Sequence, residues 1–425
     1  MKGIVIGGGL SGLGACIEME NKVDEITLVE KENHLMGVAS SFNVEGYNIP
    51  QYYHHVSDQN TIDFFKQANL YDKIVEKRVK AGFYIEGDEK FSQLNKSKLL
   101  FFKPFTLHDK IKFGLMGLKL MFSTSDIRKL DKISAEEWLS KNATPHVARF
   151  FGGLLENHKF PIPFSEMSAA WLYERFKIEM GKSSILGYPK GREGWEIISD
   201  YASKKLKGNI VTNTSVDKII MDGGYVNKIF TGNNEINVSK DDLVVCCLPA
   251  TMVPGIVEGM PTDIGNKFSS IDYATNVSVV IGIEDNLSDL YWINTIGKYP
   301  FGTIIDQNNL YGEFPWRVFY ISNYYDKNDP FLKMSDDEIF SYYMRYFEQI
   351  FKKKVKVLWH KVNRTPYGGA IEKVGLFDAI PTNKEFSNIK FAGQYMTYPY
   401  ERSTGRTVVS GQDAVKSFFE TSGNA

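Results

Sequence analysis

The sequence of 425 residues predicts an α/β fold, in which a domain built on a parallel sheet is interleaved with a second domain of the α+β class. Three observations predict this architecture. The chain opens on an apolar run, a glycine turn and a helix-compatible stretch. Apolar, strand-like runs recur in the middle of the chain and near its end. A largely helical segment separates the opening region from the strand-like runs in the middle. Such a chain passes from one domain to the other and back, so we expect no single linker between them.

The glycine turn follows the apolar run of residues 3–6 and precedes a helix-compatible stretch over residues 13–20. Gly7, Gly9 and Gly12 have the G-x-G-x-x-G spacing of a Rossmann-like dinucleotide-binding turn. In that motif the first glycine makes a tight turn, the second lets the backbone approach a pyrophosphate, and the third lets the helix pack on the strand. The sequence therefore predicts a nucleotide-binding site that begins at Gly7.

Leu10 and Ser11 lie at the start of the predicted helix, where free N–H groups and the helix dipole favour the negative charge of a diphosphate. The motif also requires an acid about twenty residues after the turn, to bind ribose hydroxyls. Residues 26–29 read as a second strand that ends at Glu30, with Lys31 next. A secretory signal is the alternative interpretation of the N-terminus, but the four glycines of this segment disfavour it.

Composition and charge limit the function classes. Hydrophobic residues make up 43% of the chain and charged residues 24%, as in ordinary globular proteins. Lys and Arg number 50 against 51 Asp and Glu, so no bulk attraction to nucleic acid is expected. Cys16, Cys246 and Cys247 form neither a plausible disulfide framework nor a C-x-x-C metal pair, which favours a reducing, cytoplasmic location. No uncharged apolar run reaches about 18 residues, so no transmembrane span is predicted.

A family resemblance becomes visible over residues 1–56, which contain the glycine turn and Glu30. They resemble the start of the FAD-dependent superfamily that contains amine oxidases, protoporphyrinogen oxidases and phytoene desaturases. The family's Gly-Gly-Arg turn reads Met-Gly-Val at residues 36–38, so its arginine is missing. Tyr-Tyr-His-His at residues 52–55 is more similar to a bacterial and archaeal Tyr-His-His branch of NAD(P)/FAD-dependent oxidoreductases, often associated with surface-sugar pathways, and distantly to UDP-galactopyranose mutase. The resemblance implies FAD as the cofactor.

Residues 57–190 have a largely helical, amphipathic pattern. Within them, residues 109–122 alternate lysines with apolar side chains. Such a helix is compatible with peripheral membrane contact, but we favour a helix of a domain that covers the substrate. Ser134 followed by Glu137 predicts a capping box at the start of another helix.

The chain then returns to strand-like patterns. Residues 209–219 read as strand, turn and strand, and residues 225–230 and 235–238 alternate like a small antiparallel sheet. Residues 242–249 form a continuous apolar strand. The resemblance implies that the backbone at Val216 packs against the FAD adenine. Residues 276–283 and 316–321 read as strands of the second domain.

The C-terminal segment closes the nucleotide domain, with a short strand and turn over residues 389–394 and a helix over residues 405–415. In the resembled superfamily the turn reads Ala-Gly-Asp, whereas Gln394 stands here in place of the aspartate. The resemblance implies that the helix N-terminus points at the N1–C2 edge of the flavin, where its dipole stabilises the charge of the reduced ring. The predicted cofactor-binding residues are Gly7, Gly9, Leu10, Ser11, Gly12, Glu30, Lys31, Val216, Gly393, Gln394, Gly405, Arg406, Thr407 and Val408.

We accordingly predict two interleaved domains. Residues 1–56, 190–250 and 384–425 form the Rossmann-like FAD-binding domain, which has a parallel sheet and a small antiparallel sheet. Residues 57–189 and 251–383 form the α+β substrate domain.

Catalytic residues are less well indicated. The candidates are His54, His55 and Arg364. No metal is predicted, because adjacent histidines point in different directions and no third ligand accompanies them. Four arginines offer bidentate partners for an anionic substrate or the FAD diphosphate: Arg192, Arg364, Arg402 and Arg406.

The resemblance implies an oxidoreductase that transfers a hydride from a small-molecule substrate to flavin N5. A nucleotide-linked or lipid-linked sugar is the first substrate hypothesis, while the apolar helix of residues 111–122 favours a lipid, porphyrin or polyene. The alternative is a redox-neutral, flavin-dependent sugar mutase. A protein that binds FAD or NAD only for structure or sensing is a third class.

Overall fold

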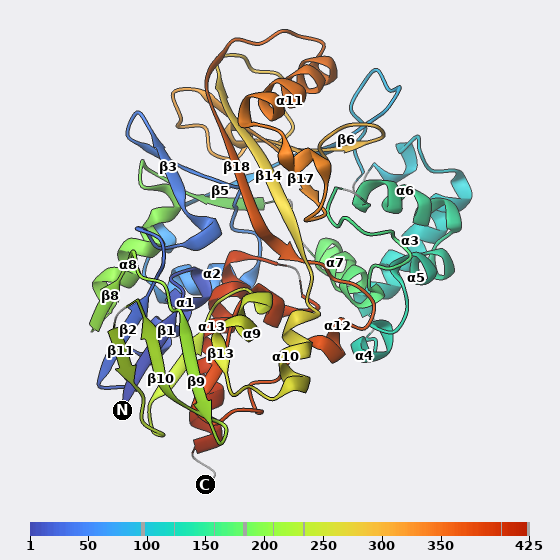
Figure 1. The fold of residues 1–425 in the computed structure, drawn as a ribbon. Coiled ribbons are helices and arrows are strands. Elements are labelled where there is room, and N and C mark those ends of the chain that lie inside the picture. Colours follow the sequence, from blue (N-terminus) through green and yellow to red (C-terminus); the bar gives the residue numbers. More distant parts are fainter. Residues whose placement is uncertain are drawn as a thin grey trace.

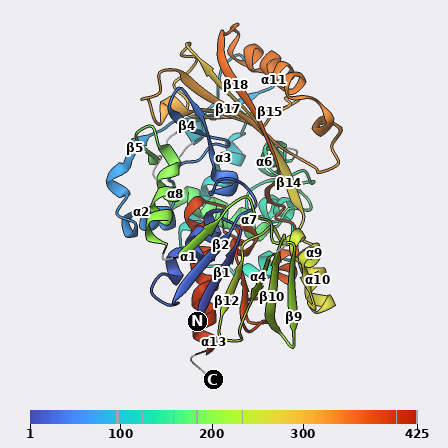
Figure 2. The same ribbon diagram turned by 60° about the vertical axis from the view of Figure 1, so that its left-hand side comes forward.

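Two large sheets occupy opposite ends of the molecule. The computed structural model describes residues 1–94, 98–122, 124–156, 158–181, 185–206, 208–232, 234–400 and 402–422. Figure 1 and Figure 2 both show the parallel sheet near the two chain termini and the larger sheet at the far end. A group of helices between residues 107 and 181 lies to one side of both sheets (Figure 1). The α/β class predicted from the sequence is confirmed.

The first sheet is parallel and five-stranded, in the order β19-β12-β1-β2-β8. Its strands are β1 (Lys2–Ile6), β2 (Glu25–Val29), β8 (Gly208–Val211), β12 (Leu243–Cys246) and β19 (Ile389–Phe391). Three helices belong with it: α1 (Leu10–Met19), α8 (Ile197–Lys205) and α13 (Thr404–Ser422). Since β1, β12 and β19 are parallel neighbours, the turns after them lie at one edge of the sheet.

Smaller sheets surround this core. A four-stranded sheet has the order β11-β10-β9-β13 and comprises β9 (Lys218–Asp222), β10 (Tyr225–Thr231), β11 (Asn234–Asn237) and β13 (Val257–Glu258). A hairpin pairs β3 (Ser41–Val44) with β4 (Tyr47–Pro50), and an antiparallel pair joins β5 (Ile74–Arg78) to the distant β7 (Ile185–Pro189). The predicted small antiparallel sheet corresponds to β9, β10 and β11.

The second large sheet is six-stranded, in the order β18-β14-β17-β16-β15-β6. Its strands are β6 (Ala81–Ile85), β14 (Tyr273–Ile283), β15 (Trp292–Ile296), β16 (Thr303–Asp306), β17 (Arg317–Tyr325) and β18 (Val357–Ala370). Helix α11 (Asp336–Phe351) packs on one face through Tyr343 and Phe347, which are fully buried. Ser335 and Glu338 form a reciprocal capping box at its start.

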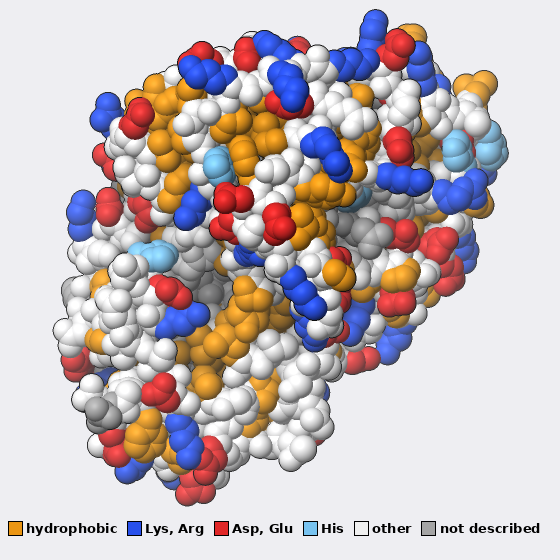
Figure 3. Space-filling model, turned by 45° about the horizontal axis from the view of Figure 1, so that its top comes forward, with side chains coloured by type: hydrophobic (Ala, Val, Ile, Leu, Met, Phe, Trp, Pro, Cys, Tyr) orange, Lys and Arg blue, Asp and Glu red, His pale blue; other side chains and the backbone are white. Residues whose placement is uncertain are grey.

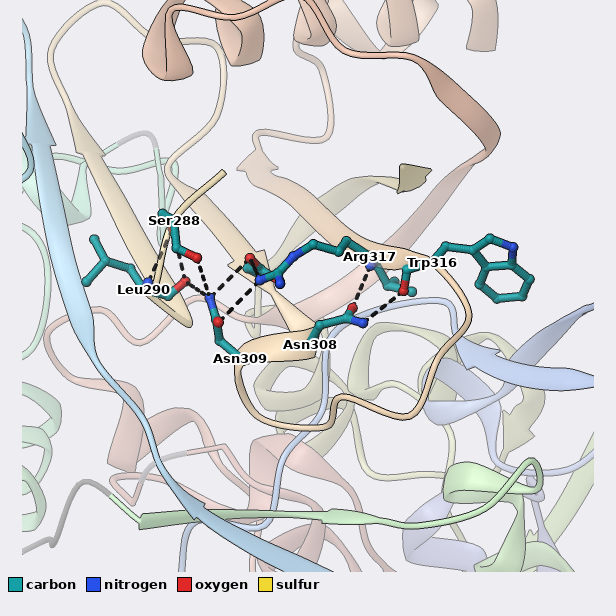
Figure 4. Close-up of polar contacts among 8 residues, drawn as sticks. Ser288, Leu290, Asn308, Asn309, Trp316 and Arg317 are labelled. Carbon is teal, nitrogen blue, oxygen red and sulfur yellow. Dashed lines mark hydrogen bonds and ion pairs between the residues drawn. The ribbon is translucent and has the colours of Figure 1, made fainter. Parts of the chain in front are cut away.

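A polar network fixes the turn between β16 and β17 (Figure 4). The Asn309 side-chain amide donates to the carbonyls of Ser288, at 3.1 Å, and Leu290, at 2.8 Å. Buried Asp306 pairs with Arg317, and burial raises the pKa of Asp306 to about 6 although Arg317 opposes the shift. These bonds lie within the six-stranded sheet, so they position its strands.

The remaining helices fill the space beside the sheets. They are α2 (Gln59–Gln67), α3 (Leu107–Phe122), α4 (Ile127–Leu130), α5 (Ala135–Asn142), α6 (Pro145–Leu155), α7 (Ala169–Gly181), α9 (Val253–Ile256), α10 (Thr262–Ser269) and α12 (Leu376–Ala379). Aromatic rings join α3, α6 and α7, with Phe113 stacked on Phe151 at 5.7 Å. Among the described residues, no helix combines the length and apolar composition needed to cross a bilayer.

The prediction of a largely helical segment over residues 57–190 is wrong in part, because β5, β6 and β7 lie there. Strand β6 is the edge of the six-stranded sheet and pairs with β15, which lies about 200 residues later. No local sequence pattern indicates that β6 pairs with β15. Ser134 caps α5 by accepting from the Glu137 N–H, which is one of the two hydrogen bonds of the predicted capping box.

We propose to keep the predicted domain boundaries. All strands of the parallel sheet fall within residues 1–56, 190–250 and 384–425, and all strands of the six-stranded sheet fall within residues 57–189 and 251–383. One contiguous hydrophobic core nevertheless includes Ile4 of β1 and Phe113 of α3. The two predicted domains therefore share buried contacts.

Candidate functional site

The glycine turn after β1 has the geometry that its spacing predicts. Gly7 adopts φ +98°, a left-handed conformation that favours glycine. A Cβ at Gly12 would lie 1.9 Å from the Gly7 carbonyl oxygen, so only glycine lets α1 approach the turn. A Cβ at Gly9 would meet nothing within 4 Å, which leaves open space beside the backbone at that position. The three glycines thus have three different roles.

Helix α1 presents its N-terminus at this open space. Its first intrahelical bond runs from the Leu13 N–H to the Gly9 carbonyl, so the N–H groups of the preceding residues have no acceptor in the helix. The side chains of Leu10 and Ser11 are buried, at 8% and 4% exposure. Leu10 and Ser11 would therefore contact a ligand through their backbone.

Glu30 lies beside the glycine turn, at the end of β2, and is 7% exposed. Its carboxylate accepts from the Gly8 N–H at 2.6 Å and from the Glu32 N–H at 2.8 Å. Lys31 instead points to solvent and pairs with Glu32 at 3.4 Å. The Thr214 N–H donates to the Glu30 carbonyl at 3.0 Å, which holds the loop of Val216 along the same edge.

The C-terminal segment meets the glycine turn through two close helix contacts. A Cβ at Gly14 would lie 2.1 Å from the Val408 carbonyl oxygen, and a Cβ at Gly411 would lie 1.9 Å from that of Ser11. Helices α1 and α13 therefore cross at backbone contact distance. Gly393, with φ +145°, follows β19 at the same sheet edge, and its N–H donates to Ser410 on α13.

The first turn of α13 is already bonded within the chain. The Gly405 N–H donates to Thr61 Oγ1 at 2.9 Å, the Arg406 N–H to Ser403 Oγ at 3.2 Å, and the Thr407 N–H to the Ser403 carbonyl at 3.1 Å. A flavin contact at this helix end would therefore depend on the helix dipole rather than on these N–H groups. The Arg406 guanidinium stacks on Tyr400, with 4.0 Å from its central carbon to the ring centre.

The two candidate histidines lie among aromatic rings. His54 packs beside Trp195, and its buried Nε2 has no hydrogen-bond partner in the described part of the chain. Burial lowers the pKa of His54 to about 4. His55 Nδ1 lies 3.2 Å from the Tyr291 hydroxyl, and its ring meets Trp292 edge-on. Within the described residues, no group of three His, Cys, Asp or Glu side chains could hold a metal ion.

Arg364 lies apart from the other candidates. Its guanidinium donates to the Leu332 carbonyl at 3.0 Å and pairs with Asp336, the first residue of α11. Its strand neighbour Asn363 instead donates to the Gln51 carbonyl, on the opposite face of the sheet. Arg364 therefore belongs to the α11 side, and its position gives no support to a catalytic role.

A buried charged cluster was missed from the sequence. Arg402, just before α13, lies 3.9 Å from Glu372, and the two side chains are 6% and 4% exposed. Both Nη atoms of Arg402 are buried and have no hydrogen-bond partner among the described residues. Its guanidinium packs on the rings of Phe160 and Tyr324. A Cβ at Gly369 would lie 1.2 Å from Arg402 Nη1, so a side chain there would displace the guanidinium.

Lys159 adds a second basic side chain to this cluster. Its amino group lies 5.4 Å from the centre of the Tyr324 ring. Burial, and then the charges of Arg402 and Arg175, hold the pKa of Lys159 well below its usual range. Burial raises the pKa of Glu372, although Arg402 and Lys159 oppose the shift. The lowered pKa of Lys159 and the raised pKa of Glu372 each favour the neutral form, so the Arg402 guanidinium supplies the positive charge of the cluster.

The cluster lies close to the predicted cofactor edge. Gln394 Oε1 accepts from the Ala370 N–H at 3.3 Å, two residues before Glu372. Of the four arginines predicted as partners of an anion, only Arg402 is buried: Arg192 is exposed over Tyr47, and Arg364 and Arg406 are engaged elsewhere. The glycine pair at 368–369 within a strand is the one sequence signal for the cluster, because it marks a close approach.

Comparisons with known proteins agree with this geometry. The family model described as flavin containing amine oxidoreductase matches residues 10–417. No curated protein matches the chain in sequence.

Similar solved structures include a putative protoporphyrinogen oxidase from Exiguobacterium sp. 255-15, with 16% identity, TM-score 0.76 and 99% of both chains covered. Reduced UDP-galactopyranose mutase has 14% identity and TM-score 0.76, with 99% of this chain and 96% of that chain covered. Cyclohexylamine oxidase from Brevibacterium oxydans IH-35A has 14% identity and TM-score 0.73, with 99% of both covered. At such identities these likenesses show the fold. Together with the family match over most of the chain, they identify this protein as a member of the flavin-containing amine oxidoreductase family and an FAD-dependent oxidoreductase.

Proposed function

We propose that this enzyme oxidises an anionic small molecule, with a nucleotide-linked or lipid-linked sugar as the first substrate class. The observation that carries the proposal is the buried Arg402, whose two Nη atoms lack a partner beside Lys159. A buried guanidinium without a full partner is costly, and a bidentate phosphate or carboxylate removes that cost. The rings of Phe160 and Tyr324 hold the guanidinium in place.

The residues at the edge of the parallel sheet fit an FAD. Support comes from the open space at Gly9, the backbone contacts of Glu30 and the close packing of α1 on α13. When bound, FAD supplies a two-electron acceptor, so that a hydride leaves the substrate carbon for flavin N5.

The chain's own residues orient the substrate and exclude water. Arg402 and Lys159 would bind its anionic group, and the raised pKa of Glu372 keeps that carboxyl from cancelling the positive charge. Tyr53 and His55 lie against Trp292, at 5.1 Å and 5.8 Å between ring centres. Such rings offer faces on which a sugar or nucleotide ring can pack.

The second candidate is a redox-neutral sugar mutase that uses reduced flavin. The similarity in fold to UDP-galactopyranose mutase over nearly the whole chain favours it. The two candidates differ in electron balance, because a mutase returns the flavin to its starting state while an oxidoreductase leaves it reduced.

Anaerobic mixing of the FAD-loaded enzyme with UDP-sugars tests the proposal. Bleaching of the flavin by a UDP-sugar indicates oxidation. A spectral change without bleaching, with isomerisation only after dithionite reduction, indicates a mutase. Arg402→Gln should weaken the spectral response at least tenfold, whereas Arg192→Gln, at an exposed arginine, should leave it unchanged.

Thermal shift measurements can contradict the sugar assignment. A ligand at a hundred times its dissociation constant stabilises by about 2.7 kcal/mol. Stabilisation by primary amines or porphyrins, with none from nucleotide sugars, would overturn the sugar assignment and leave the FAD assignment standing. Equal responses of the Arg402→Gln variant and the wild type would remove Arg402 from the site.

A further inference from the structure

Helix α3 has one face buried against the protein and a second, apolar face exposed to solvent. The residues that face the protein are Asp109, Phe113, Met116, Gly117 and Leu120. A second row lies on the opposite side at spacings of four, four, three and four: Leu107, Ile111, Leu115, Leu118 and Phe122. At about 100° per residue these five fall on one stripe. All five are exposed, so the helix presents an apolar stripe to solvent.

Exposed apolar side chains concentrate at this helix. We call the patch the α3 outer face; it contains the stripe together with Leu100, Phe101 and Met121. Phe101 is 81% exposed and Phe122 is 87% exposed. Eight of the fifteen exposed large hydrophobic residues in the described part of the chain lie in this patch. Single exposed apolar residues are ordinary, but a contiguous patch marks an interaction surface.

The helix that carries the patch is firmly held. Asp109 accepts from the Thr106 N–H at 2.9 Å and from the Thr144 hydroxyl at 2.5 Å, and it lies 2.7 Å from His146 Nδ1. Phe113 packs on Phe151 and on Phe176 of α7. The outer face is therefore presented by a fixed element, at the edge of the molecule away from the parallel sheet (Figure 1).

The segment that carries the patch is basic. Five lysines lie between residues 98 and 122: Lys98, Lys103, Lys110, Lys112 and Lys119. Asp109 is the sole acid of that stretch, and it is turned inward. On the helical wheel Lys112 and Lys119 flank the stripe on one side and Lys110 on the other. Figure 3 shows basic side chains at the right-hand edge, the side on which Figure 1 places α3, with acidic side chains beside them.

We propose that the α3 outer face docks on the surface of a bilayer that contains anionic lipids. An apolar helical stripe flanked by lysines is the pattern of a helix that lies in the membrane interface, where the amino groups reach the head groups. A second copy of the chain fits less well, because a two-fold interface would place the same lysines against one another. This inference does not depend on the substrate proposed above.

Vesicle flotation of the full-length, FAD-loaded protein tests it. Vesicles of phosphatidylcholine alone are compared with vesicles that also contain phosphatidylglycerol. We expect flotation with the anionic vesicles, weakened by high salt. Leu115→Gln/Leu118→Gln and Lys112→Gln/Lys119→Gln should each reduce the bound fraction at least tenfold. The matched control Ile185→Gln/Leu358→Gln alters apolar residues that are 39% and 40% exposed elsewhere, and should bind like the wild type.

Three outcomes overturn the proposal. One is a wild-type protein that does not float with anionic vesicles. Another is equal flotation of the wild type and the Leu115/Leu118 variant. The third is a wild-type dimer, measured by light scattering, that this variant converts to monomers, since a second copy would then cover the patch. Thermal unfolding checks that each variant is folded, and Ile111→Gln replaces the leucine pair if that pair fails to fold.

Discussion

Glu30 connects the second strand to the glycine turn, because its carboxylate binds the N–H groups of Gly8 and Glu32 from a buried position. We predict that Glu30→Ala weakens FAD binding while the protein stays folded. Lost hydrogen bonds to a charged group cost about 1.5–3 kcal/mol, which corresponds to a rise of about tenfold to a hundredfold in the dissociation constant. Isothermal titration of the apoprotein with FAD measures it, and Glu32→Ala is the exposed control. An unchanged affinity would mean that Glu30 does not contact the ribose.

We predict that His54 makes the stability of the protein depend on pH, because burial lowers its pKa from 6.5 to about 4. A base with a lowered pKa binds fewer protons in the folded state than in the unfolded state. Its contribution to stability is therefore present above pH 6.5 and is lost as the pH falls toward 4. The loss amounts to about 3 kcal/mol at the acid end.

Urea unfolding between pH 4 and pH 7 tests this dependence. We expect His54→Gln to flatten the acid slope, whereas His34→Gln, at an exposed histidine, keeps it. The same slope in the wild type and the His54 variant would show that another group carries the acid sensitivity.

Helices α1 and α13 meet at backbone distance, and glycine makes this crossing possible. We predict that Gly411→Ala destabilises the protein by about 1–3 kcal/mol, since its Cβ would lie 1.9 Å from the Ser11 carbonyl oxygen. Gly265→Ala in α10 is the control, because its nearest contacts lie at 4.0 Å and alanine favours a helix by about 0.5–1 kcal/mol. Chemical denaturation should give opposite signs for the two variants. Equal effects would contradict the account of the crossing.

At the element scale, sequence patterns succeed where the determinants are local. Gly7, Gly9, Gly12 and Glu30 lie within one β-α-β unit, and residue spacing alone predicts their arrangement. Strands β6 and β18 were not predicted, because they depend on partners that are distant in sequence. Helix α11 was also not predicted, although Ser335 and Glu338 give it a capping box.

The Arg402 cluster shows the same limit at the site. Lys159, Glu372 and Arg402 come from three separate segments, and no spacing rule relates them. Arg402 was one of four arginines proposed from the sequence, and only burial distinguishes it from Arg192. Charged groups that meet from distant segments can be recognised only when the fold is known.

Across the whole molecule, one hydrophobic core joins the parallel sheet to the helices of the other predicted domain, as the burial of Ile4 and Phe113 in one cluster indicates. We predict a single unfolding transition for the FAD-loaded protein, with flavin fluorescence and far-UV circular dichroism giving the same midpoint. FAD at a hundred times its dissociation constant should raise the stability by about 2.7 kcal/mol in both signals. Two separated midpoints would indicate domains that unfold independently.

We propose that the glycine turn, Glu30 and the C-terminal helix form one non-covalent FAD site. The most direct measurement is the absorption spectrum of the purified protein before and after denaturation and filtration. We predict a yellow protein that releases stoichiometric FAD into the filtrate, because residues 393–397 after β19 contain no cysteine to attach it. A colourless protein that FAD cannot reconstitute would contradict the account.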